Sequence, residues 1–379
     1  MNNLFDYATS ELSQDAVICW CLNWLNESAS NLYPLAVDLL KKMGEVTVES
    51  GQTLQTIQQF YKTDILICLT GKNRVILVED KTDSSEHGEQ IRRYRERMTQ
   101  LSEEERRLCG IHENVELRTV YFKTGFLYDA DRLVDADVTI TGEAFLQCLT
   151  PYQGKSEILD AYLTFLERKL EQQAREKDFL QEPERLNNSA IAQHTLMRMI
   201  FPETLWKRGS VLYEVYHGSS FGRPWTEMVI AEYLFPTQKD GYRIFWRMDS
   251  DQDGTYLSLR FYDPYNKKDA EEKQTHVEAY RKHRAQIEAI CTYEFEPDSM
   301  WAWENVRCGH TENYYEASLL TLHLEQVLKH WDTEREALLQ CSYTVKKQQH
   351  KLRTAYPTIL YQSGAVTRKC CCSIFMPLK

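Results

Sequence analysis

Residues 63–81, TDILICLTGKNRVILVEDK, determine the fold of the first half of the chain. Two apolar runs rich in β-branched residues, 63–70 and 74–81, flank the turn-forming triplet 71–73, which reads Gly-Lys-Asn. Runs of this kind on either side of a short turn segment are typical of a β-hairpin. We therefore expect two buried antiparallel strands here.

The segments around this hairpin predict a mixed α/β domain. Before it, apolar residues at helical spacing predict a helix over 11–26, and alternation predicts a short strand over 45–49. After it, a strongly charged stretch with helical spacing spans 86–101. The other expected elements are a strand at 116–123, a strand at 137–140 and a helix at 142–149. This order of elements predicts a layered α/β architecture over residues 1–150.

Charged residues stand near the ends of the two hairpin strands. Asp64 opens the first strand, and the second strand ends with Glu79, Asp80 and Lys81. Antiparallel pairing brings Asp64 and Glu79 together, and Glu79 and Lys81 share one face because side chains alternate along a strand. Two carboxylates and the backbone carbonyl of Asp80 would suit Mg²⁺ or Mn²⁺. A lysine beside such an ion can steady an attacking water or the charge on a phosphate.

The pattern Asp64…Glu79-x-Lys81 resembles the motif of the PD-(D/E)xK nuclease superfamily, over residues 5–150. The resemblance implies an α/β fold with a restriction-endonuclease-like αβββαβ core and a mixed sheet. One departure from the usual motif is that Thr63, not proline, precedes Asp64. Residues 10–16, SELSQDA, also look like the opening of a bacterial subfamily of such nucleases.

The same resemblance extends to two neighbouring helices. Glu11 is similar to a first-helix glutamate that belongs to the site in this superfamily, holding the ion directly or through water. Gln90 and Tyr94 match the Gln-x-x-x-Tyr pair of RecB-like members, which implies a role in positioning the substrate strand. Arg92, on the same helix, is a further candidate for contact with a phosphate backbone.

The resemblance implies a metal-dependent nuclease that hydrolyses phosphodiester bonds of nucleic acid. DNA is favoured over RNA, and phage defence or DNA processing is the context that the superfamily suggests. The alternatives are a catalytically silent nucleic-acid-binding or sensing module and an RNA-cleaving enzyme. Each motif also has a simpler interpretation: a solvated strand edge for Asp64 and Glu79, an amphipathic helix for Gln90 and Tyr94, and an ordinary first-turn carboxylate for Glu11.

The second half resembles no known family. We expect a connecting helix and linker over 151–184, with the break at Pro183, and a C-terminal α+β domain over 185–379 that recognises substrate, a partner protein or a second copy of the chain. Within it we expect a helix near 188–200, a loop at 221–225, a hairpin turn at 249–254 and helices over 269–289 and 319–348. Strands are expected near 211–216, 242–248 and 255–262.

Composition restricts the remaining possibilities. The 379 residues carry a net charge of −11, which argues against a broad phosphate-binding surface but not against one local basic groove. Eleven cysteines, an odd number without a Cys-x-x-Cys pair, argue against a disulfide framework or a zinc ribbon. No run approaches the roughly 18 apolar residues of a membrane span, and the N-terminus lacks a secretory pattern. We therefore expect a cytoplasmic protein that does not enter membranes.

Overall fold

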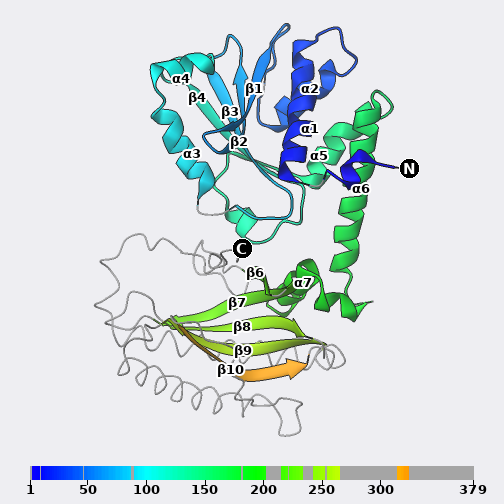
Figure 1. The fold of residues 1–379 in the computed structure, drawn as a ribbon, viewed down its shortest axis with the longest axis vertical. Helices are drawn as coiled ribbons and strands as arrows, with labels where there is room; N and C mark the ends of the chain where they lie inside the picture. The colour runs from blue at the N-terminus through cyan, green and yellow to red at the C-terminus, as the bar shows by residue number, and fades with distance from the viewer. Residues whose placement is uncertain are drawn as a thin grey trace, which may run out of the picture. The chain divides into compact units, whose positions relative to one another are not determined.

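The computed structural model divides the chain into two compact units, residues 1–175 and 176–379 (Figure 1). It describes residues 2–8, 10–45, 47–86, 89–180, 182–201, 215–220, 222–233, 242–251, 254–264 and 314–323. The sequence placed the end of the first domain at residue 150. The first unit extends further because the next long helix, α6 (Glu157–Lys177), packs into its core through Leu159, Leu163 and Leu166.

A five-stranded mixed sheet forms the centre of the first unit. Its strands lie in chain order: β1 (Leu54–Phe60), β2 (Thr63–Leu69), β3 (Arg74–Lys81), β4 (Glu116–Lys123) and β5 (Val138–Thr141). β1–β2 and β2–β3 are antiparallel, whereas β3–β4 and β4–β5 are parallel. The expected hairpin and the expected mixed α/β architecture are confirmed.

Helices cover both faces of this sheet (Figure 1). One face packs against α1 (Glu11–Asn23), α2 (Tyr33–Lys42), α5 (Gly142–Leu149) and α6, around Ile65, Ile67, Ile76 and Val78. The other face, with Leu66 and Leu77, packs against α3 (Gln90–Thr99). α4 (Glu103–Leu108) follows α3. Short 3₁₀ helices cover Leu4–Asp6, Trp24–Asn26, Ala130–Leu133, Thr150–Tyr152 and Pro183–Asn187.

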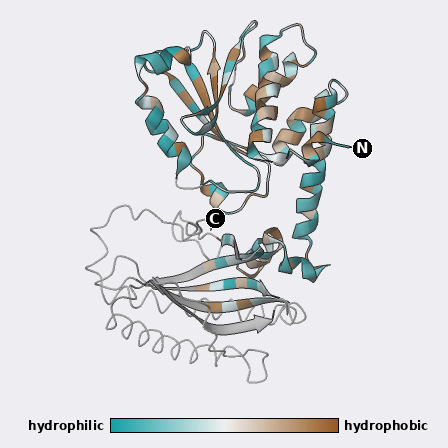
Figure 2. Cartoon of the chain, viewed as in Figure 1, coloured by the Kyte–Doolittle hydropathy of each residue, from teal (hydrophilic) through white to brown (hydrophobic). Residues whose placement is uncertain are grey.

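Side-chain alternation explains why both faces are covered. Neighbouring residues of β2 and β3 point to opposite faces, and both sets are apolar until the strand ends. Hydrophobic residues accordingly gather on the strands and α1, whereas α3 is largely hydrophilic (Figure 2). None of the helices in the described ranges is both long enough and apolar enough to cross a membrane.

The strand expected at 45–49 is wrong. Residues 47–49 are irregular, and the strand that pairs with β2 is β1, whose outward positions are glutamines and therefore show little apolar alternation. Glu45 does not join a sheet. Its carboxylate instead accepts hydrogen bonds from Arg74 and Lys72, with Arg74 Nη1 2.6 Å from Glu45 Oε2.

The described residues of the second unit form a helix and a five-stranded antiparallel sheet. The helix is α7 (Ala190–Ile200), and the sheet order is β10-β9-β8-β7-β6. The strands are β6 (Val215–Ser220), β7 (Arg223–Tyr233), β8 (Tyr242–Asp251), β9 (Gly254–Pro264) and β10 (Tyr314–His323). Phe201, directly after α7, stacks on Trp246 of β8 with ring centroids 6.0 Å apart.

Several expectations for this unit are corrected. The loop expected at 221–225 is largely strand, since Arg223 begins β7 and Trp225 stacks under Arg247, 4.6 Å from guanidinium carbon to ring centroid. The hairpin at 249–254 is confirmed, because Asp251 pairs with Gly254. Residues 319–323 lie in β10, not in a helix. The expected helix at 269–289 and the remainder of 324–348 lie outside the described residues, as do 211–214.

Candidate active site

The charged residues expected at the hairpin lie together at one edge of the first sheet. Asp64 is the second residue of β2, and Glu79 and Lys81 lie near the end of β3. The register Ile65↔Val78 continues toward this edge, so the two carboxylates meet across the strand pair. α1 begins beside them and contributes Glu11. Four residues from three elements thus come together.

Lys81 is the centre of this group. Its Nζ lies 2.6 Å from Oε1 of Glu79, 3.6 Å from Oδ2 of Asp64 and 4.0 Å from Oε2 of Glu11. The same Nζ donates a hydrogen bond of 3.0 Å to the backbone carbonyl of Asp80. Burial on its own would lower the pKa of Lys81, but Glu79, Asp64 and Glu11 together raise it well above its ordinary value. The lysine is therefore held as a cation among carboxylates.

Glu79 is the most deeply buried acid of the group. Its side chain is fully inaccessible, and burial, followed by the nearby charge of Asp64, raises the pKa of Glu79 to about 7 against the opposing effect of Lys81. Neither carboxylate oxygen makes a hydrogen bond within the part of the chain that the structure describes, although Oε1 touches Lys81. An acid in this state binds either a proton or a cation readily.

Asp64 and Glu11 are more open and are held by neighbouring groups. Oδ2 of Asp64 accepts a 2.8 Å hydrogen bond from the backbone N–H of Asp80, which fixes it across the strand pair. Oε1 of Glu11 accepts a 2.6 Å hydrogen bond from the hydroxyl of Ser84 in the loop after β3. Both carboxylates can therefore face solvent while remaining close to Lys81.

The side chain of Asp80 points to the opposite face of the sheet, as its position in the strand requires. There Gln14 donates a hydrogen bond to Asp80, and Thr124 donates one to Gln14. Asp15 lies against Asp80. Burial and then the charge of Asp15 raise the pKa of Asp80. Burial, with Asp64 as the second cause, raises the pKa of Asp15 to about 7.

Sequence reasoning missed this buried network and also a second buried lysine. Gln14 and Asp15 follow Glu11 by three and four residues, a spacing that places all three on one side of α1 and could have indicated them. Lys123 ends β4 opposite Lys81 and is fully buried; its Nζ donates to the carbonyl of Ser84 and lies 3.8 Å from Asp131. Burial lowers the pKa of Lys123.

On the face of the sheet to which Glu79 and Lys81 point, α3 places Gln90 and Tyr94 toward the site. The amide of Gln90 donates to the hydroxyl of Tyr94 at 3.2 Å, and that hydroxyl donates to the backbone carbonyl of Lys62 at 2.6 Å. Burial and then the charge of Glu79 raise the pKa of Tyr94. Arg92 points elsewhere: its guanidinium is exposed and pairs with Glu89 and Glu96.

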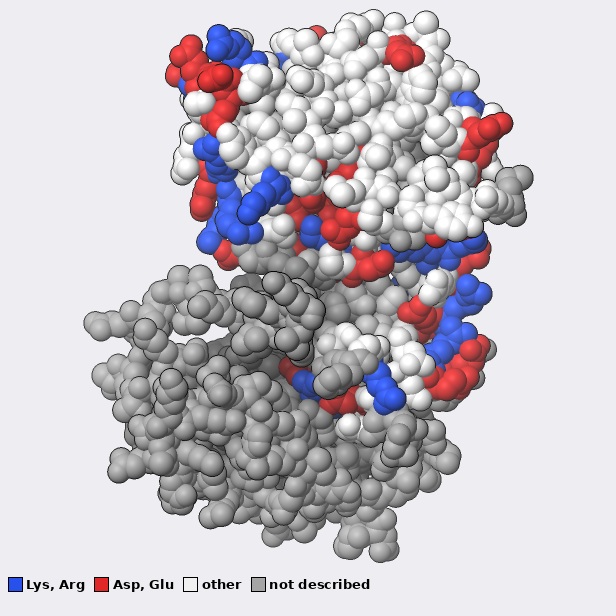
Figure 3. Space-filling view, viewed as in Figure 1, with Lys and Arg blue, Asp and Glu red and all other residues white. Residues whose placement is uncertain are grey.

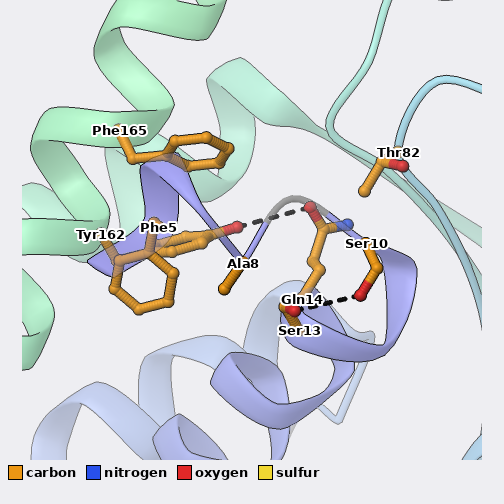
Figure 4. Close-up of a pocket in the computed structure, with 8 residues that line it drawn as sticks. All are labelled: Phe5, Ala8, Ser10, Ser13, Gln14, Thr82, Tyr162 and Phe165. Atoms are coloured by element: carbon orange, nitrogen blue, oxygen red, sulfur yellow. Dashed lines mark hydrogen bonds between the residues drawn. The ribbon is translucent and has the colours of Figure 1, made fainter. Parts of the chain in front are cut away.

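A small pocket lies next to the Gln14 network (Figure 4). Its wall combines aromatic side chains from the N-terminal segment and α6 with small polar residues at the start of α1. The lining residues are Phe5, Ala8, Ser10, Ser13, Gln14, Thr82, Tyr162 and Phe165. The hydroxyl of Tyr162 donates to Oε1 of Gln14 at 3.4 Å, so the polar floor of this pocket is already occupied by internal bonds.

The Lys81 edge offers carboxylate oxygens, the donor type that hard divalent cations prefer. Glu79 presents buried carboxylate oxygens without hydrogen bonds, and Asp64 presents a second carboxylate beside it. The carbonyl of Asp80, expected to be a ligand, is engaged by Lys81 instead. Within the described ranges, no three His, Cys, Asp or Glu side chains are arranged as a metal centre. No family model, curated protein or solved structure matches this chain.

Proposed function

We propose that the first unit is a metal-dependent nuclease that hydrolyses phosphodiester bonds of nucleic acid, with DNA as the favoured substrate. The observation that carries the proposal is the contact of one buried lysine with the carboxylates of Glu79, Asp64 and Glu11 at a strand edge. A structural ion pair needs one carboxylate for one lysine. Three acids around a single cation leave an excess of negative charge that a divalent ion would neutralise.

Each residue has a distinct role in this proposal. Asp64 and Glu79 would hold Mg²⁺ or Mn²⁺, with Glu11 contributing directly or through water. The ion, when bound, would polarise the phosphate and lower the pKa of water. Lys81 would orient the attacking water and offset charge that develops on the phosphate. Tyr94 and Gln90 would position the substrate strand beside Glu79.

The fold is consistent with this reading. A helix, three strands, further helices and a parallel fourth strand occur in the order that the PD-(D/E)xK resemblance implies, which supports a restriction-endonuclease-like core as part of the proposal. In the same proposal the second unit recognises substrate, a partner or a second copy, and the biological context is phage defence or DNA processing.

Incubating the full chain with linear duplex, circular duplex and single-stranded DNA and with RNA tests the proposal. Cleavage of at least one substrate is expected with Mg²⁺ or Mn²⁺, and EDTA should abolish it. Ca²⁺ should not replace Mg²⁺, because its looser coordination orients water poorly. Cleavage in excess EDTA would refute the metal assignment. Binding without cleavage under every metal condition would favour the silent binding module instead.

A further inference from the structure

The turn between β1 and β2 has an unusual backbone for its sequence. Phe60 pairs with Thr63, so Tyr61 and Lys62 are the two central residues of a tight hairpin. Both have positive φ, 51° and 71°, which is the pattern of a type I′ turn. Such turns strongly prefer Asn-Gly, because glycine adopts positive φ freely, asparagine tolerates it, and most other side chains are strained there. Tyrosine and lysine are poor choices for this turn.

Side chains of α3 hold this turn in place, and none of these contacts involves the side chain of Lys62. The guanidinium carbon of Arg97 lies 4.1 Å from the centroid of the Tyr61 ring, and the ring of Phe60 packs edge-on against it at 4.8 Å. The hydroxyl of Tyr94 binds the carbonyl of Lys62. These contacts engage the Tyr61 ring and the backbone of Lys62, and the lysine side chain remains exposed.

A second exposed cation belongs to the same edge of the molecule. Arg93 precedes Arg97 by four residues, so both project from the side of α3 that meets the turn. The other arginines of α3 are paired: Arg92 with Glu89, Arg95 with Asp135, and Arg97 with Glu105. Across the described ranges, Arg93 and Lys62 form no ion pair. Figure 3 shows basic side chains gathered at one end of α3, next to acidic ones.

These observations point to a binding function for a strained turn. We propose that Lys62 and Arg93 bind the phosphodiester backbone of a nucleic acid strand and lead it to the Asp64–Glu79 edge. Lys62 precedes Asp64 by two residues, and the Tyr94 that holds its carbonyl also lies near Glu79. The inference rests on the proposed nuclease function, since it names how that site receives its substrate. It replaces Arg92 with Arg93 as the phosphate contact on α3.

Binding measured without cleavage tests the inference. Fluorescein-labelled duplex DNA, single-stranded DNA and RNA of equal length would be titrated with the full chain in EDTA, over a series of salt concentrations. Lys62→Met removes the charge, and Lys62→Gly also relieves the strained φ. Both are expected to weaken binding of the preferred strand about tenfold, and to lower the salt slope by about 0.9 for duplex DNA or about 0.7 for a single strand.

Stability separates this role from a structural one. Lys62→Gly is expected to unfold at the wild-type temperature or roughly 2–4 °C above it, because glycine suits the turn. Arg93→Ala should reproduce the loss of binding, and Lys42→Met, an exposed lysine on α2 across the sheet, should bind as wild type. Wild-type affinity in both Lys62 variants would overturn this inference, but it would not bear on the proposed nuclease activity. A wild-type chain that binds none of the three nucleic acids would overturn it as well.

Discussion

Charged residues that are neighbours in the sequence of β3 have different surroundings on the two faces of the sheet. Glu79 and Lys81 point to the α3 face, where three carboxylates surround one lysine and two of them reach solvent. Asp80, between them in sequence, points to the α1 face and is enclosed by Gln14 and Asp15. On the α1 face, Gln14 donates a hydrogen bond to one oxygen of Asp80, while Oδ2 of Asp80 and Oδ1 of Asp15 have none in the described structure. On the α3 face, the buried carboxylate of Glu79 has no hydrogen bond in the described structure.

The difference lies in access to solvent: the Asp80 carboxyl is enclosed, whereas Glu11 and Asp64 beside Lys81 are partly exposed. Buried polar groups normally find hydrogen-bond partners, and Asp80 follows that rule through one of its two carboxylate oxygens. A buried acid without such partners costs folding energy, and strongly perturbed acids of this kind concentrate at functional sites. The network also has a positioning consequence, because the backbone N–H of Asp80 binds Asp64 and its carbonyl binds Lys81. The backbone of Asp80, whose side chain is enclosed on the α1 face, thus holds Asp64 and Lys81 in place on the α3 face.

The largest expected effect concerns the pH dependence that Glu79 confers. Its folded-state pKa of about 7 lies above the unfolded value of about 4.5, so the folded chain binds the proton more tightly. The contribution of Glu79 to stability should therefore be fully present below pH 4.5 and be lost as the pH rises through 7, a change of up to roughly 3 kcal/mol for this group. In EDTA, Glu79→Gln should remove this part of the fall in melting temperature between pH 5 and pH 8.

Glu45 is the matched control, because it is a buried glutamate with the opposite shift. Burial would raise its pKa, but hydrogen bonds from Arg74 and Lys72 lower it overall. Its contribution to stability is present above the unfolded pKa and disappears as the pH falls through the folded value. Glu45→Gln should therefore destabilise the chain at pH 8. Parallel pH profiles for wild type and Glu79→Gln would show that Glu79 is not perturbed.

A smaller effect is expected from Asp80. Asp80→Ala leaves Gln14 and Asp15 without a buried partner and should lower the free energy of unfolding by about 2 kcal/mol. Asp80→Asn should be close to neutral, because its amide can donate to Asp15 while its carbonyl oxygen accepts from Gln14. Chemical denaturation of both variants checks this. Equal losses in the two variants would mean that the side chain is held by packing and not by this network.

The hairpin, and the proximity of the charged residues at its strand ends, could be predicted from the sequence. Residues 63–81 have apolar runs, a turn triplet and charges near the strand ends. In the structure the apolar runs form β2 and β3, and the charged residues lie near the ends of these strands. The proximity of Asp64, Glu79 and Lys81 follows from antiparallel pairing and alternation alone. Glu11 required the family resemblance, because no periodicity indicates where a first helix docks against a strand edge.

The features that escaped prediction depend on tertiary contacts. β1 is an edge strand whose exposed positions are glutamines, and it is recognised as a strand only by its pairing with β2. The Asp80 network needs α1 to cross β3 and β4, which no local pattern specifies. The helix expected from residue 319 begins as strand β10 because its branched and apolar residues pair with β9. In each case the partner strand or helix, and not local propensity, decides the structure.

The comparison of two lysines tests the central claim most directly. Lys81 and Lys123 are register partners at the ends of β3 and β4 and are both buried, but only Lys81 contacts the carboxylates of Glu79 and Asp64. Turnover would be measured with Mg²⁺ for wild type, Lys81→Met and Lys123→Met, each normalised to folded protein. Lys81→Met is expected to lose about 10²-fold or more of turnover. Lys123→Met is expected to have a lower melting temperature but near-wild-type turnover. Wild-type turnover in Lys81→Met would show that Lys81 has no part in catalysis.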